Sequence, residues 1–162
     1  MLPRRYRRPP PYIYSCKEVE SIVSSATSLS SAKGLRGPTF STVFGLLSVT
    51  GMRIGEVVAL DKDDVDLEAG VLTVRMGKRG KSRFVPIHAT TSDVLRRYSV
   101  KRDAVVPHSP TPAFFVSERG RRVSTGSAQG NFIKVARLVG LRSSTGDGRR
   151  GVGPGRACIR RR

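Results

Sequence analysis

The side chains that stand out for their chemistry are cations. The chain has 30 Lys and Arg residues against 12 Asp and Glu residues, a formal net charge of +18 over 162 residues. Arg53 and Lys78 lie in glycine-containing motifs, TGMRIGE and GKRGKSR. A guanidinium group presents a planar fork of donors that matches phosphate oxygens, and an ammonium group is a compact point donor. A polyanion is therefore the expected partner.

The composition excludes several classes of protein. Hydrophobic residues make up 38% of the chain, so it is not disordered by composition. No run approaches the roughly 18 apolar residues that a membrane span requires. The two cysteines, Cys16 and Cys158, exclude a disulfide scaffold and a cysteine-based zinc cluster, and they point to a reducing cytoplasm. We expect no membrane contact, no cofactor and no metal.

Helical periodicity indicates the elements that position these cations. Ser15 and Glu18 fit a capping box that starts a first helix, which is expected to end before Gly34. Further helices are expected over residues 38–49, 53–60, 92–105 and 127–139. The helix over 38–49 is apolar nearly all round and should lie in the middle of the core. In the helix over 92–105, Tyr98 should face inward and Arg102 outward.

Two β-rich runs complete the expected fold. Residues 71–76 and 81–87 are joined by the glycine-bounded connection 77–80, which is typical of a hairpin with two antiparallel strands. Residues 113–117, AFFVS, should form a short apolar strand or an extended segment. The expected fold class is α+β, mainly helical with a small antiparallel β-sheet.

The order and spacing of these motifs resemble the tyrosine recombinases, the phage-integrase family. The resemblance runs from about Tyr12 to Leu141. It includes FGLLSVTGMRIGEVVALDKDDVDLEAGVLTVRMGKRGKSRFVPIH almost without interruption, followed by AFFVSERGRRV and a helix. Each short motif is weak by itself, but the motifs together, in this order, are a strong signal.

The resemblance implies a catalytic domain that curls around duplex DNA and cuts one strand by transesterification. In this family a tyrosine attacks the scissile phosphate, two arginines stabilise the charge on the phosphoryl oxygens, and a hairpin lysine protonates the leaving sugar oxygen. Negative charge builds up on the non-bridging oxygens in the transition state, where a fixed guanidinium fork can meet it. A lysine on a mobile turn can reach the leaving oxygen and exchange its proton.

By position, Arg53 corresponds to the family's first phosphate-binding arginine. Without the flanking motif, the favoured interpretation would be an ordinary helix-start arginine paired with Glu56 at i+3. With the motif present, the resemblance favours the catalytic role. Glu56 is then expected to orient the guanidinium or to hold the helix in place.

Lys78 matches the family's hairpin lysine better than Lys81 does, because Lys81 belongs to the strand that continues as SRFVPI. For both lysines the alternative is a solvated turn residue that touches phosphate without specificity, and for Lys81 we favour that alternative. Arg79 and Arg83 are assigned to contacts with the DNA backbone.

The histidines and tyrosines do not fit the family's remaining catalytic roles. His88 follows the hairpin and His108 lies in a proline-rich loop, so both are interpreted as surface imidazoles. The tyrosines all precede the place where the family's nucleophile stands, and they are Tyr6, Tyr12, Tyr14 and Tyr98. None of them is assigned as the nucleophile.

The chain divides into three parts. Residues 1–11 form a basic, proline-rich arm or linker, residues 12–141 a partial tyrosine recombinase catalytic domain, and residues 142–162 an Arg/Gly-rich tail that we expect to be disordered. The family's H-x-x-R box and nucleophilic tyrosine should begin shortly after Leu141, and this sequence does not contain them. The abrupt change of composition indicates a frame disruption or a truncated gene.

Three hypotheses about function follow. The leading one is a truncated site-specific recombinase that binds double-stranded DNA but cannot cleave it alone, because covalent catalysis needs the nucleophile and its partners as a unit. The second is a nonenzymatic, basic DNA-binding module that modulates an intact recombinase. The third is a gene remnant that folds poorly because helices of the missing half normally cover its core.

Overall fold

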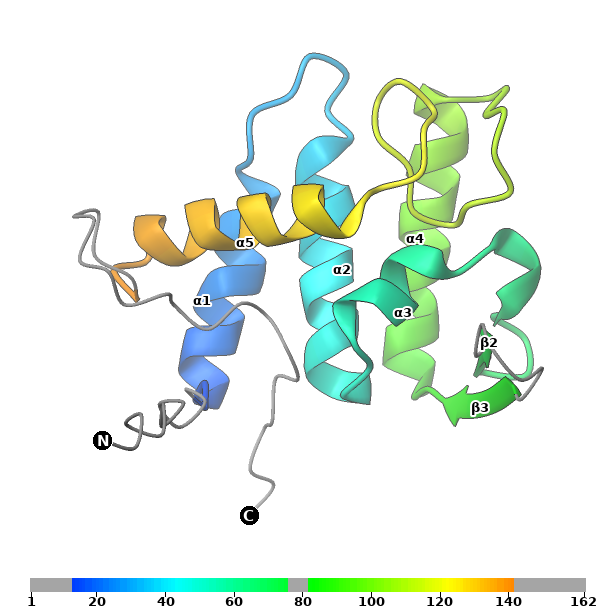
Figure 1. The fold of residues 1–162 in the computed structure, drawn as a ribbon, viewed down its shortest axis with the longest axis horizontal. Helices are drawn as coiled ribbons and strands as arrows, with labels where there is room; N and C mark the ends of the chain where they lie inside the picture. Colours follow the sequence, from blue (N-terminus) through cyan, green and yellow to red (C-terminus); the bar gives the residue numbers. More distant parts are fainter. Residues whose placement is uncertain (1–12, 76–81, 142–162) are drawn as a thin grey trace, which may run out of the picture.

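The computed structural model describes residues 13–75 and 82–141. The described elements, shown in Figure 1, are α1 (Cys16–Thr27), α2 (Arg36–Thr50), α3 (Ile54–Ala59), η1 (Lys62–Asp64), β1 (Val65–Asp66), β2 (Val71–Arg75), β3 (Ser82–Pro86), α4 (Ala89–Val105) and α5 (Thr125–Leu138). The expected α+β class, mainly helical with a small antiparallel sheet, is confirmed. The expected arm at 1–11 and tail at 142–162 lie outside the described residues.

Helix α2 lies at the centre of the fold, with α1, α4 and α5 packed around it (Figure 1). Its core-filling side chains are Phe40, Val43, Phe44, Leu46 and Leu47. The helix begins at Arg36, so Gly37 and Pro38 stand in its first turn, where the missing N–H of proline costs no helical bond. Gly37 also allows α1 to approach closely, because a Cβ there would meet the carbonyl oxygen of Thr27 at 2.3 Å.

Helix α1 begins with the predicted capping box. The hydroxyl of Ser15 accepts from the amide of Glu18 at 3.3 Å, and the amide of Ser15 donates to the Glu18 carboxylate at 2.7 Å. The helix ends at Thr27, well before Gly34, although Leu29 beyond its end is still buried. The helix therefore ends before Gly34, as predicted, and the apolar pattern continues past its end to the buried Leu29.

The sheet has the strand order β1-β2-β3, and both strand pairs are antiparallel. The predicted hairpin is present as β2 and β3, with Arg75 and Ser82 opposite each other at its end. Strand β1 is not apparent in the sequence, because it has only two residues in an acidic segment and exists by pairing with β2. The connection 76–81 lies outside the described residues.

Helix α4 starts before the predicted position 92 because His88 caps it, with Nδ1 accepting from the amide of Thr90 at 3.3 Å. The outward placement of Arg102 was wrong, since its side chain is only 4% exposed. Its Nη1 donates to the carbonyl oxygen of Phe114 at 3.0 Å, and its guanidinium lies 5.1 Å from the centroid of the Phe114 ring. Asp103 pairs with the same guanidinium, so the buried charge is compensated.

The segment 113–117 is apolar and largely buried, but it bends at Phe114 and Phe115 and forms two isolated bridges in place of the expected strand or extended segment. These bridges pair Ala113 with Asp61 and Val116 with Arg122. The segment leads to α5, which crosses α1 and α2 (Figure 1). None of the helices in the described ranges is long and apolar enough to cross a membrane.

Candidate functional site

Arg53 lies at the junction between α2 and α3. Helix α2 is capped after Thr50 by Gly51, which has a left-handed φ of 65° and donates its N–H to the carbonyl oxygen of Leu47 at 3.1 Å. Arg53 then caps α3 in an extended conformation, between Met52 and Ile54, which are 0% and 7% exposed. Two buried neighbours thus fix the backbone while the Arg53 side chain is exposed. Within residues 13–75 and 82–141, its guanidinium has no hydrogen-bond or ion-pair partner.

Glu56 joins the start of α3 to strand β3. Its Oε2 accepts from the backbone amide of Arg53 at 2.7 Å and from Nη2 of Arg83 at 2.8 Å. The carboxylate therefore binds the main chain of Arg53 and the side chain of Arg83, and the i+3 ion pair between Arg53 and Glu56 is not formed among the described contacts. Of the two roles expected for Glu56, the geometry fits holding the helix in place.

The other strand of the hairpin, β2, is attached to the same region of the chain. Nε of Arg75 donates to Oδ1 of Asp64 at 2.6 Å, and Oδ2 of Asp64 accepts from the amide of Asp61 at 3.0 Å. Asp64 is only 4% exposed, so this carboxylate is a buried anchor for the end of β2. The sequence gives no local signal for this pair, because its members are 11 positions apart. Both strands of the hairpin are thus attached to the segment that follows Arg53.

The other predicted site residues belong to the hairpin. Arg83 keeps 45% of its side chain exposed beside Glu56, so it retains donors that can face a phosphate. Lys78, Arg79 and Lys81 lie outside the described residues. The paired ends of β2 and β3 bracket that connection.

The comparison with protein families identifies the chain. The model of a family described as "Phage integrase family" matches residues 15–150 of this chain. The chain belongs to the phage integrase family. This membership agrees with the motifs around Arg53 and the hairpin.

Individual integrase relatives cover most of this chain. The protein y4rE of Sinorhizobium fredii, named as an integrase/recombinase, is 46% identical over 139 residues, which are 86% of this chain and 45% of that protein. Tyrosine recombinase XerD of Mycobacterium leprae is 39% identical over 103 residues, which are 60% of this chain and 32% of that protein. The chain thus spans about half the length, or less, of these two relatives.

The fold is also that of solved integrase-family structures. The crystal structure of XerA recombinase matches with a TM-score of 0.71 and 24% identity, over 91% of this chain and 48% of that one. A structure of lambda integrase bound to DNA matches with a TM-score of 0.56 and 21% identity, over 85% of this chain and 46% of that one. At these identities the likeness shows the fold alone.

Tyr98, His88 and His108 lie in structural or surface positions of the described part. Tyr98 is buried, and its hydroxyl accepts from the amide of Val116 at 3.2 Å and lies 3.4 Å from the Thr39 hydroxyl. Desolvation by burial raises the pKa of Tyr98, which disfavours the phenolate. His88 serves as a helix cap, and His108 is exposed in its loop, as expected.

A second cationic region is not predicted by the sequence patterns. A pocket of about 450 Å³ has four arginines in its lining, Arg36, Arg119, Arg121 and Arg122. Three of them come from the turn SERGRRV, and this local cluster of arginines is the feature of the sequence that could have indicated the cationic region. Arg36 precedes them by more than 80 positions, so the fold alone brings the fourth arginine to this pocket.

Proposed function

We propose that this domain binds duplex DNA and that Arg53 binds the non-bridging oxygens of one backbone phosphate. The observation that carries the proposal is the state of Arg53, whose backbone is fixed between buried neighbours and whose exposed guanidinium has no described carboxylate partner. A donor fork on a fixed backbone needs little reorganisation when a phosphate arrives. Solved proteins with this fold support DNA as the ligand, since lambda integrase was solved bound to DNA and XerH with its difH substrate.

The hairpin is proposed to supply the second cation. In the family's pattern Lys78 protonates the leaving sugar oxygen, and Arg79, Lys81 and Arg83 contact the DNA backbone. The contact between Glu56 and Arg83 supports this arrangement, because it attaches strand β3 to the helix that Arg53 caps. The two cations of the motif would then face the same phosphodiester.

We further propose that the chain alone binds DNA without cleaving it. The last tyrosine of the printed sequence is Tyr98, and it precedes the segment where the family's nucleophile stands. Its buried hydroxyl, bonded to the amide of Val116, is unsuited to attack a phosphate. In covalent catalysis the loss of the nucleophile removes most of the rate even when the phosphate-binding groups remain.

A nicked suicide duplex tests both parts of the proposal. The full chain is incubated with the duplex, and free DNA, shifted DNA and covalent adducts are separated on native and denaturing gels. We expect a shifted band on the native gel that weakens steeply with salt, and no adduct on the denaturing gel. A covalent protein–DNA adduct would refute the lack of cleavage, and the absence of any shift at low salt would refute DNA binding.

A second candidate function follows from the same exposed arginine. A domain that binds the phosphate but lacks the nucleophile would occupy the DNA of an intact recombinase without cutting it. Addition of the chain to a recombination assay with an intact relative tests this hypothesis. Inhibition that depends on Arg53 favours a modulator, and unchanged recombination at saturating chain excludes one.

A further inference from the structure

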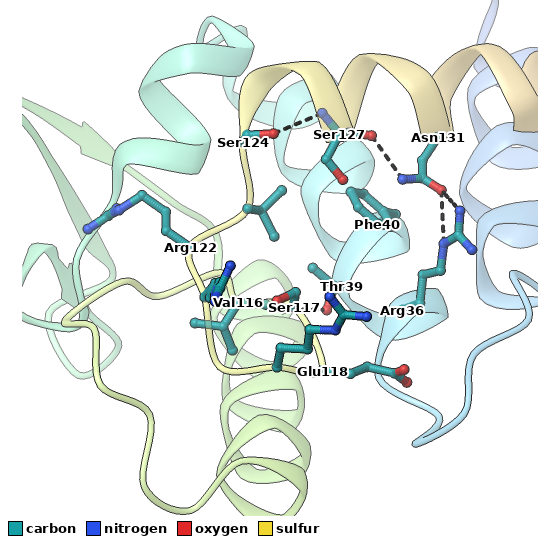
Figure 2. Close-up of a pocket in the computed structure, with 13 residues that line it drawn as sticks. Arg36, Thr39, Phe40, Val116, Ser117, Glu118, Arg122, Ser124, Ser127 and Asn131 are labelled. Atoms are coloured by element: carbon teal, nitrogen blue, oxygen red, sulfur yellow. Dashed lines mark hydrogen bonds between the residues drawn. The ribbon is translucent and has the colours of Figure 1, made fainter.

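The arginine-lined pocket lies between the start of α2, the loop before α5 and the first turn of α5 (Figure 2). Its volume of about 450 Å³ is in the range of pockets that hold small ligands. Its polar lining includes Arg36, Arg119, Arg121, Ser117, Ser124 and Ser127. The pocket thus combines positive charge with hydroxyl donors.

Arg36 is held in this pocket by neutral partners. Oδ1 of Asn131 accepts from Nε of Arg36 at 3.0 Å and from Nη2 at 2.7 Å, as Figure 2 shows. Asn131 is 7% exposed and is fixed in turn by donating to the carbonyl oxygen of Ser127 at 2.8 Å. Nη1 of Arg36 also donates to the carbonyl oxygen of Ser30 at 3.5 Å. The guanidinium is therefore oriented, and no carboxylate of residues 13–75 and 82–141 forms an ion pair with it.

Glu118 is the one carboxylate among the described residues that line the pocket. Its Oε1 accepts from the backbone amides of Lys33 and Leu35 at 2.9 and 3.1 Å, so the carboxylate is engaged by the loop before α2. A hydrogen bond from the Ser31 side chain, followed by these backbone amides, lowers the pKa of Glu118 below its usual value of 4.5. The carboxylate is ionised at neutral pH, but its lone pairs already have donors.

The remaining arginines differ in the charge that they leave available. Arg122 pairs with Asp61 and extends away from the other labelled side chains in Figure 2. Arg119 and Arg121 are exposed, and neither has an ion-pair partner in the part of the chain that the structure describes. The described lining of the pocket therefore holds three arginines without a described ion-pair partner, Arg36, Arg119 and Arg121, and one carboxylate, Glu118.

We propose that this pocket binds a phosphate group. Guanidinium forks and hydroxyls are the side chains that match several phosphate oxygens at once, and the oriented Arg36 is the fixed member of the set. The phosphate group can belong to a DNA backbone or to a free phosphate ester. Only the first of these two ligands rests on the proposed function.

Two probes and two matched variants test the pocket in the full chain. Inorganic phosphate and, separately, a random-sequence duplex are titrated while the Arg36 Nε–H and Ser127 amide signals are followed by NMR. The pocket variant is R119A/R121A. The control is R97A/K101A, which removes two exposed cations of α4 that have no described ion pair. Duplex affinity is then measured over a salt series for each protein.

We expect saturable shifts with phosphate that R119A/R121A abolishes and R97A/K101A preserves. If the source is DNA, R119A/R121A should lower duplex affinity about tenfold relative to the control variant. The slope of log affinity against log salt concentration should also be smaller than in the control, by about 0.9 for each DNA phosphate that the variant no longer neutralises. Phosphate shifts with equal duplex affinities for the two variants identify a free phosphate ester as the source. The same shifts in a chain that binds no DNA overturn the proposed function and leave the pocket standing. No saturable shift with either probe in the folded chain overturns the pocket.

Discussion

Glu56 and Arg83 form an ion pair of 2.8 Å that links helix α3 to strand β3 across 27 positions of sequence. The same carboxylate oxygen accepts from the backbone amide of Arg53 at 2.7 Å. A partly exposed pair of this kind contributes only about 0–1 kcal/mol to folding. Its main effect is therefore geometric, because it places the hairpin beside the arginine proposed to bind phosphate.

A double-mutant cycle measures this link. We expect E56A and R83A each to lower the free energy of unfolding by about 1 kcal/mol or less, with a coupling energy of about 0.5–1 kcal/mol. E56A should cost more than R83A, because it also removes the acceptor of the Arg53 amide. Urea unfolding followed by circular dichroism gives all four values. A coupling energy of zero would show that the pair does not hold the hairpin.

Gly37 is expected to be the least replaceable glycine of α2. A Cβ there would lie 2.3 Å from the carbonyl oxygen of Thr27, so G37A must push α1 away from α2. We expect a loss of about 2–3 kcal/mol in unfolding free energy. Gly45 of the same helix is the matched control, since a Cβ there meets nothing within 4 Å and G45A should gain up to about 1 kcal/mol. Equal effects of the two substitutions would refute the close approach.

Tyr98 is expected to stabilise the fold in a way that is lost at high pH. Desolvation by burial raises the pKa of Tyr98 above its usual value of 10.0. The unfolded chain ionises first, so this contribution to stability is complete below about pH 10 and is lost as the pH rises through the raised pKa. Y98F removes this dependence and leaves the Val116 amide without its acceptor, at a cost of about 1–2 kcal/mol. The unfolding free energies of the wild type and Y98F are measured from pH 8 to 11, and their difference should be largest at pH 8. A difference that stays constant over this range would contradict a raised pKa for Tyr98.

Asp103 is expected to contribute to stability at neutral pH. A side-chain hydrogen bond from Arg102 lowers the pKa of Asp103 below its usual value of 3.8. The contribution is therefore complete above the unfolded pKa and is lost as the pH falls through the lowered one. Thermal melts of the wild type and D103N should differ at pH 7 and converge toward pH 2. A difference that stays constant over this range would show that Asp103 does not stabilise through its charge.

Local features of the sequence predicted most of the helices and the hairpin. The Ser15–Glu18 capping box is contained within one turn, and in the sequence Gly77 and Gly80 lie within two positions of the strand ends Arg75 and Ser82. Strand β1 escaped prediction because two residues carry no periodicity. The burial of Arg102 also escaped, because the carbonyl group that binds it belongs to Phe114, in a loop beyond the end of α4.

The candidate site divides in the same way. The resemblance to the family motif predicted Arg53 and the hairpin lysine as site residues, since each lies in a short characteristic stretch, and their roles stay predictions. The contacts beside Arg53 and along the described strands of the hairpin are long-range, as between Asp64 and Arg75 or between Glu56 and Arg83. The contact between Arg36 and Asn131 spans 95 positions, and no local pattern reports such a distance. These contacts depend on packing, which single motifs do not encode.

The affinity of R53A for duplex DNA tests the central claim most directly. The full chain, R53A and the matched variant R97A are titrated with one random-sequence duplex over a salt series, after circular dichroism has shown that all three are folded. We expect R53A to bind about tenfold more weakly with a salt slope smaller by about 0.9, and R97A to change affinity by less than about twofold. Equal affinities and slopes for R53A and R97A would contradict the claim that Arg53 holds a phosphate.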